Sequence, residues 1–188
     1  MGICAILLAA GSGSRFGGGK LLAQLADGVP VGLASWRNLE SAVKHSLVVV
    51  RIGDTELGDL FRNEGARLIE CKDAHAGMSR SLIAGIEATA ESNGWIIALG
   101  DMPYIKPETI RKIANAIELG ALIAMPTHRG TRGHPVGLSS RLLPELLAVK
   151  GDEGAREVVR RHAGQCELIA CDDDSGVLRD IDTRDDLA

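Results

Sequence analysis

The stretch "ICAILLAAGSGSRFGGGKLL", residues 3–22, joins an apolar run to a glycine-rich loop with two positive charges. Its first eight residues are almost all apolar, which is typical of a central strand covered on both faces of a sheet. The loop carries Arg15 and Lys20, and its glycines let backbone N–H groups come close to an anion. In open α/β sheets, ligands bind beyond the carboxyl ends of the strands. The stretch therefore predicts an α/β protein that holds an anion at this loop.

The rest of the chain repeats the alternation of strand and helix. Apolar runs of strand length occur at 46–52, 66–70, 95–100 and 121–126, with amphipathic stretches between them at 34–44, 54–65, 78–92 and 106–120. This rhythm predicts an α/β fold, a three-layer Rossmann-like sandwich with a mainly parallel mixed sheet.

The last third of the chain departs from the rhythm. The run at 134–139 follows 127–133 so closely that we expect a hairpin-like return and one antiparallel strand. We expect helices near 140–148 and 154–163 and a strand at 166–171. Because no linker or repeat is visible, the sequence predicts one domain over residues 1–188.

Composition argues against several partners. The net charge is −4, aromatic residues make up 3%, and the chain lacks a long basic run, so we expect no nucleic-acid partner. We expect no membrane span and no secretory signal, because no apolar segment approaches about 18 residues and the start lacks a basic region. The four cysteines have no Cys-x-x-Cys spacing, which favours reduced, buried thiols in a cytoplasmic protein over a zinc site.

Two well-known phosphate motifs do not fit the loop. The dinucleotide pattern G-x-G-x-x-G begins at Gly11 and Gly13, but its third glycine falls on Phe16. The P-loop pattern ends correctly at Gly19-Lys20, but Leu21 occupies the position of the magnesium-binding Ser or Thr. The loop must therefore be interpreted from its own residues.

Those residues suit a chain of phosphates. The backbone at Gly11 and Gly13 and the hydroxyls of Ser12 and Ser14 are donors for an anion. Arg15 can meet one phosphate as a fork while Lys20 meets another as a point charge, and we expect both side chains to be exposed. The alternative is a mobile surface loop with two solvated charges.

Two aspartates are candidates for a metal. Asp101 directly follows the apolar run at 95–100, which places it at the ligand-binding edge, although a turn or cap residue would look the same. If the strand-like "VLRDI" returns beside the sheet, Asp182 reaches the same edge, where two carboxylates require a cation between them. The alternative is that Asp182 caps a short helix beginning at Thr183.

The loop pattern "LAAGSGSRFGGGKLL" resembles the signature L-A-A-G-x-S-x-R-x-G-x-x-K-L-L of MobA-like NTP transferases. It departs where Gly13-Ser14 stands in place of Ser and another residue. Further blocks resemble the family in the same order: "GMSRSLIAG" (77–85), "GDMPYI" (100–105), "RGHPVGLS" (132–139), "GDEGAR" (151–156) and "DIDTRDDL" (180–187). The segment at 25–42 and Arg184, where the family has Pro, depart from its pattern.

The resemblance implies a nucleotide-diphospho-sugar transferase-like fold and the roles of several residues. Catalysis would fall to Arg15, Lys20 and Asp101, and Mg²⁺ to Asp101 and Asp182. His134 and Arg156 would contact the acceptor substrate. The implied nucleotide-binding residues are Leu8, Ala9, Ala10, Gly11, Ser12, Gly13, Ser14, Arg15, Lys20, Ser81 and Asp101.

Within the family the blocks most resemble the molybdenum cofactor cytidylyltransferases. That resemblance implies transfer of CMP from CTP to a molybdopterin-type cofactor with release of pyrophosphate, and a molybdoenzyme or its chaperone as the partner that receives the product. "LAAG", with Ala10 where guanylyl-transferring relatives tend to carry Gly, favours CTP. The alternatives are a guanylyltransferase using GTP, an enzyme for another phosphorylated acceptor, and a non-catalytic nucleotide-binding protein.

Overall fold

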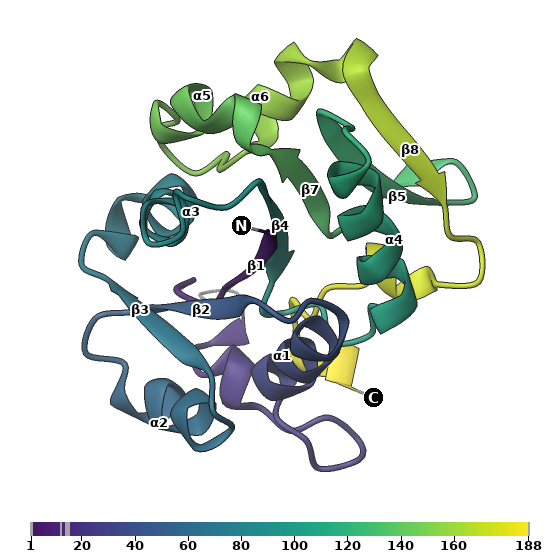
Figure 1. Cartoon of the computed structure of the whole chain (residues 1–188). Helices are drawn as coiled ribbons and strands as arrows, with labels where there is room; N and C mark the ends of the chain where they lie inside the picture. The colour runs from purple at the N-terminus through teal and green to yellow at the C-terminus, as the bar shows by residue number, and fades with distance from the viewer. Residues whose placement is uncertain (1, 12, 14–15, 188) are drawn as a thin grey trace.

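The computed structural model describes residues 2–11, 13 and 16–187, and shows one sheet between two layers of helices (Figure 1). Over these residues the strands are β1 (Ile3–Leu8), β2 (Ser46–Arg51), β3 (Arg67–Cys71), β4 (Gly94–Leu99), β5 (Ile123–His128), β6 (Thr131–Arg132), β7 (Val136–Ser139) and β8 (Cys166–Ala170). The α-helices are α1 (Val31–Ala42), α2 (Thr55–Asn63), α3 (Met78–Glu87), α4 (Pro107–Glu118), α5 (Leu143–Leu147) and α6 (Arg156–Arg161).

The sheet is mixed and mainly parallel. Its strand order is β3-β2-β1-β4-β7-β5-β6, and β8 pairs with β5. β1 runs parallel to both β2 and β4, whereas β7 is antiparallel to its neighbours β4 and β5. The α/β sandwich and the antiparallel strand expected at 134–139 are therefore confirmed.

Two helices differ from their expected bounds for local reasons. α1 begins at Val31 because Pro30 has the extended backbone of a residue that precedes a helix. α3 ends at Glu87, five residues earlier than expected. Just beyond it, the Thr89 hydroxyl donates to the Gly85 carbonyl at 2.8 Å and accepts from the Trp95 indole at 3.0 Å, so this side chain competes for helical carbonyls.

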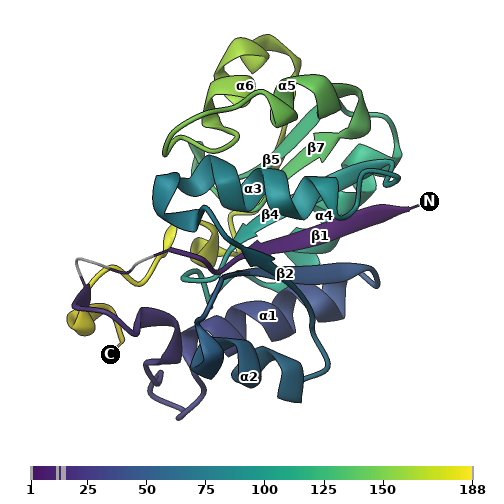
Figure 2. The same cartoon turned by 90° about the vertical axis from the view of Figure 1, so that its left-hand side faces the viewer.

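The two faces of the sheet are covered by different helices. Alternate residues of β1 point to opposite faces, so Leu7 packs in one cluster with Trp36 of α1 and Ile113 of α4. Ile6 packs in the other with Leu82 of α3. Figure 2 shows α1 and α2 on one side of the sheet and α3, α5 and α6 on the other. Because helices cover both faces of the sheet, β1 must be apolar on both of its faces, and its sequence is apolar throughout.

The chain after β8 crosses back toward the centre of the sheet without forming a strand. Residues Ser175–Leu178 form a 3₁₀ helix, η6, so the expectation of a strand at "VLRDI" was wrong. The return itself occurs, because the backbone N–H of Ile181 donates to the Asp101 carbonyl at 2.8 Å. The segment is held to the body of the protein by hydrogen bonds from other loops rather than by sheet pairing.

The buried carboxylate of Asp174 holds the start of this returning segment. It accepts hydrogen bonds from the Lys106 N–H at 2.9 Å, the Thr109 hydroxyl at 2.6 Å and the Gly176 N–H at 3.1 Å. Two of these donors lie at the beginning of α4, so Asp174 joins the end of the chain to that helix. Among the described residues, no helix is both long enough and apolar enough to cross a membrane.

Candidate active site

A cleft of about 590 Å³ lies at the carboxyl ends of β1, β2 and β4. It extends from Asp101, after β4, to Arg51 at the end of β2, and its far wall is the loop before α3. Leu8, Ala10, Gly11, Gly13 and Lys20 also line it. This is the edge at which α/β sheets bind ligands.

The glycine loop forms the rim of this cleft. Gly13 adopts a φ of +56°, and a Cβ there would lie 3.2 Å from Cβ of Lys20, so the backbone passes close to the lysine. Phe16 is buried against Val31 and Ile181 and fixes the middle of the loop to the core. Ser12, Ser14 and Arg15 lie outside the described residues.

Lys20 is the centre of the polar cluster. It begins the short 3₁₀ helix η2 (Lys20–Leu22), and its ammonium lies 2.7 Å from Oδ2 of Asp101 and 3.4 Å from Oδ1 of Asp182. Only 13% of the Lys20 side chain is exposed, against 24% for Asp101 and 37% for Asp182. The expectation that Lys20 is exposed was therefore wrong, because the two carboxylates draw its ammonium inward.

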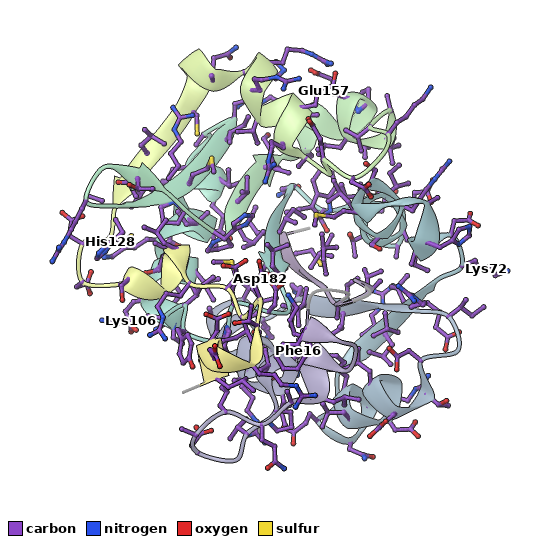
Figure 3. The ribbon with its side chains drawn as sticks, turned by 180° about the vertical axis from the view of Figure 1, so that it is seen from behind. Phe16, Lys72, Lys106, His128, Glu157 and Asp182 are labelled. Carbon is purple, nitrogen blue, oxygen red and sulfur yellow. The ribbon has the colours of Figure 1, made fainter. Side chains whose placement is uncertain are left out.

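The backbone around Asp101 is anchored from two sides. The Ser35 hydroxyl on α1 donates to the Gly100 carbonyl at 2.8 Å, and the Ile181 N–H donates to the backbone carbonyl of Asp101. Asp182 follows Ile181 directly, so the same contact brings both carboxylates to Lys20. In Figure 3, Asp182 appears near the middle of the view with Phe16 next to it, and Phe16 packs against the neighbouring Ile181.

The turn that carries Asp182 is held by the neighbouring carboxylate of Asp186. The Asp186 carboxylate accepts from the backbone N–H groups of Asp182 at 3.1 Å and Thr183 at 2.7 Å, and from the Thr183 hydroxyl at 2.8 Å. These hydrogen bonds lower the pKa of Asp186 below its usual value. Asp186 thus fixes the turn that presents Asp182 to the cluster.

The predicted nucleotide-binding residues divide between the cleft and the core. Leu8, Ala10, Gly11 and Gly13 line the cleft as expected. Ala9 is buried in the core on the α1 side, so its side chain supports the loop from below. Its backbone N–H donates to the Val49 carbonyl at 2.9 Å, which extends the pairing of β1 with β2.

The far wall of the cleft continues from the loop before α3 into the first turn of that helix. Ser81 and Met78 line it, together with Asp152 from the turn before α6. Neither Ser79 nor Ser81 caps the helix, because Gly77 holds that position and the Ser79 hydroxyl donates to the Gly151 carbonyl at 2.6 Å. The acidic residues of "GDEGAR", Asp152 and Glu153, precede α6, which begins at Arg156.

The two predicted acceptor-binding residues lie outside the residues that line this cleft. His134 is half-buried, and its Nδ1 atom is fully covered without a hydrogen-bond partner among the described residues. Burial lowers the pKa of His134 below its usual value and the charge of Arg156 lowers it further, while Asp101 and Asp180 act in the opposite direction. The exposed Arg156 and the Asp101 carboxylate therefore both lie close enough to His134 for their charges to act on its pKa.

Four polar residues that line the described part of the cleft were not predicted: Arg51, Asp54, His75 and Asp152. Arg51 ends β2, and its guanidinium donates to the Ala10 carbonyl at 3.4 Å. In the sequence, Arg51 directly follows the apolar residues at 47–50, much as Asp101 comes just after the apolar run of β4. A charge placed at the carboxyl end of a predicted central strand is the signal that could have found it.

Comparison with known proteins points to one family. The model of the MobA-like NTP transferase domain matches residues 5–166. The chain is 32% identical to the purine catabolism protein PucB of Bacillus subtilis, covering 95% of this chain and 90% of that protein. It is 29% identical to nicotine blue oxidoreductase of Paenarthrobacter nicotinovorans, covering 96% and 92%.

Solved structures share the fold. Rv0371c of Mycobacterium tuberculosis H37Rv superposes with a TM-score of 0.86 at 24% identity, covering 99% of this chain and 95% of that one. A structure of Rv0371c in complex with manganese gives 0.81, covering 99% and 96%. The 4-diphosphocytidyl-2C-methyl-D-erythritol synthase of Anaerococcus prevotii gives 0.76 at 15% identity, covering 99% and 92%. The sheet and its helices thus have the nucleotidyltransferase arrangement.

Proposed function

Since the chain belongs to the MobA-like NTP transferase family, we propose that it transfers CMP from CTP to the phosphate of a molybdopterin-type cofactor and releases pyrophosphate. The observation that carries this proposal is the Lys20 ammonium between Asp101 and Asp182, beside the glycine loop. That arrangement supports the proposal, because a cation suited to phosphate and two carboxylates suited to a metal lie together at the glycine loop.

The reaction is an in-line displacement at the α-phosphorus. An oxygen of the acceptor phosphate forms the new P–O bond as the bond to pyrophosphate breaks. Catalysis of this kind depends on positioning and on neutralising phosphate charge, which falls here to Lys20 and Arg15 with the backbone N–H groups of Gly11 and Gly13.

The carboxylates of Asp101 and Asp182 suit a magnesium ion. Carboxylate oxygens are the ligands that Mg²⁺ prefers, and it is usually held by one or two of them together with substrate phosphates. Both side chains retain partial exposure and already surround one positive charge. When bound, Mg²⁺ would neutralise charge on the phosphates.

The nucleoside would lie against Leu8, Ala10 and Ser81. The methyl group of Ala10 narrows this part of the cleft, which supports a pyrimidine over a purine. Ser12 and Ser14 would add hydroxyl donors to the phosphates. His134 and Arg156 would meet the acceptor, and the product would pass to a molybdoenzyme or its chaperone.

Two other functions have specific support. A guanylyltransferase fits the same cluster, because the family match leaves the base open. The name of the relative nicotine blue oxidoreductase supports a second class of reaction for this chain, the reduction of a substrate. The nucleotide and the chemistry are therefore tested together.

The test is pyrophosphate release by the full chain with CTP, GTP, ATP and UTP, with and without molybdopterin, at a fixed Mg²⁺ concentration. We expect release only with the acceptor present, and faster with CTP than with GTP. In Asp101→Asn the rate of pyrophosphate release should fall roughly 30- to 1000-fold, because an interaction worth about 2–4 kcal/mol in the transition state is removed. The exposed Asp173→Asn, in the same assay, should retain full rate.

Equal or faster turnover with GTP would reassign the base. Absence of pyrophosphate release with every nucleotide, together with acceptor-dependent oxidation of NADH or NADPH, would replace transfer by reduction.

A further inference from the structure

We propose that Lys20 keeps the Asp101–Asp182 pair closed to a divalent cation until the phosphates of a nucleotide draw its ammonium away. The proposal rests on the proposed function, since it concerns how the metal enters the same site. It makes metal binding dependent on the nucleotide, with Lys20 as the residue that connects them.

The first support is the position of the ammonium. Its distances of 2.7 Å to Asp101 and 3.4 Å to Asp182 place it between the two carboxylates. This is the place that a cation bridging the pair would need. An ammonium and a divalent ion compete for this place, because like charges held by the same two carboxylates repel each other even though both carboxylates are partly exposed.

The second support is burial. With 13% of its side chain exposed, Lys20 has lost most of its water and depends on these two partners for compensation. A metal arriving alone would have to displace the ammonium from the two carboxylates that now compensate its charge. Metal binding by itself is therefore opposed twice, by repulsion and by the lost ion pairs.

A nucleotide removes both obstacles. The backbone of the glycine loop passes next to Cβ of Lys20, at 3.2 Å from a Cβ built at Gly13, so phosphates bound to this loop would lie within reach of the lysine side chain. The flexible four-carbon stem lets the charge move without moving η2. Phosphate oxygens then replace the carboxylates as partners of Lys20, and the ammonium leaves its place between Asp101 and Asp182.

The test measures how tightly the full chain binds Mn²⁺ in the absence of nucleotide. The electron paramagnetic resonance signal of the free ion reports the unbound fraction. Lys20→Met should bind Mn²⁺ at least about tenfold more tightly than the wild type, because a charge of one sign is removed from the site. Lys20→Arg retains the cation and should bind as weakly as the wild type. The double variant Lys20→Met/Asp101→Asn should lose the gain, which assigns it to this carboxylate pair.

Arg51→Met is the matched control. It removes a positive charge from the same cleft, but that guanidinium contacts the Ala10 carbonyl rather than the carboxylate pair. Its Mn²⁺ affinity should change less than about threefold. A similar gain in both variants would reduce the effect to the general charge of the cleft and overturn the proposal.

The remaining outcomes separate this inference from the function. If the wild-type chain transfers CMP but Lys20→Met binds Mn²⁺ no more tightly than the wild type, the closed pair is overturned and the function is left intact. A tenfold gain in a chain that transfers no nucleotide would support the closed pair and refute the function. Melting curves of each variant confirm that only folded protein is compared.

Discussion

Replacing Asp174 by Ala should destabilise the protein strongly and also release the segment that carries Asp182. Asp174 is 1% exposed, and its carboxylate accepts three hydrogen bonds. Oδ2 takes those from Lys106 N–H and the Thr109 hydroxyl, and Oδ1 takes that from Gly176 N–H. Removing it leaves two buried donors and one partly buried donor without this acceptor and detaches the returning chain from α4.

The magnitude follows from this count. A hydrogen bond to a charged group contributes about 1.5–3 kcal/mol, and the effects of neighbouring bonds are not additive, so Asp174→Ala should cost about 3–5 kcal/mol. Asp174→Asn keeps one acceptor oxygen for Lys106 and Thr109, but its amide group faces the Gly176 donor. Its cost should be smaller, about 1–3 kcal/mol.

Equilibrium unfolding in urea, read by circular dichroism, measures the free energy of unfolding for both variants. Asp173→Ala is the control one residue away, where an exposed carboxylate lies 3.6 Å from Lys106, and it should cost less than about 0.5 kcal/mol. Turnover at a temperature where Asp174→Asn is folded should fall as well. A loss below about 1 kcal/mol in Asp174→Ala would refute the idea that this carboxylate holds the segment.

Three further predictions concern packing and pH. Gly77→Ala should cost about 1–3 kcal/mol in urea unfolding, because φ is +115° there and the new Cβ would lie 2.5 Å from Oδ1 of Asp152; wild-type stability would contradict that geometry. Gly137→Ala should cost a similar amount, about 1–3 kcal/mol, since its Cβ would meet α4 at 2.7 Å, whereas Gly164→Ala, with nothing within 4 Å, should stay near wild type. The pKa of His134 is lowered on folding, so the unfolded chain binds the proton more readily. Stability should therefore decline as pH falls through about 6.5, and His134→Gln should flatten that decline in melting curves between about pH 7.5 and 5.5; identical slopes would exclude His134 as its cause.

The sequence was most informative where apolar residues run without interruption. Strands such as β1 and β4 were predicted within two residues, because a strand buried on both faces leaves a continuous apolar signal. The position of Asp101 followed from the same signal, since the residue after a central strand has only one edge of the sheet to occupy.

The sequence was least informative where long-range contacts decide the structure. The return at 174–182 depends on the Asp174 carboxylate and on Gly176 packing against the backbone at Tyr104, and neither contact leaves a periodic pattern. The burial of Lys20 also depends on two partners that are 81 and 162 positions away. A local pattern shows such a lysine as a loop charge, and only the fold shows that it is enclosed.

The hydrogen bond from Ile181 to Asp101 makes one amide a reporter of the whole cluster. The chain segments that it joins are far apart in sequence, so the contact closes a long stretch of chain. Opening of the returning segment would expose this amide to solvent while the central strands remain paired. Its rate of hydrogen exchange therefore measures how often the assembled cluster comes apart, independently of the stability of the sheet beneath it.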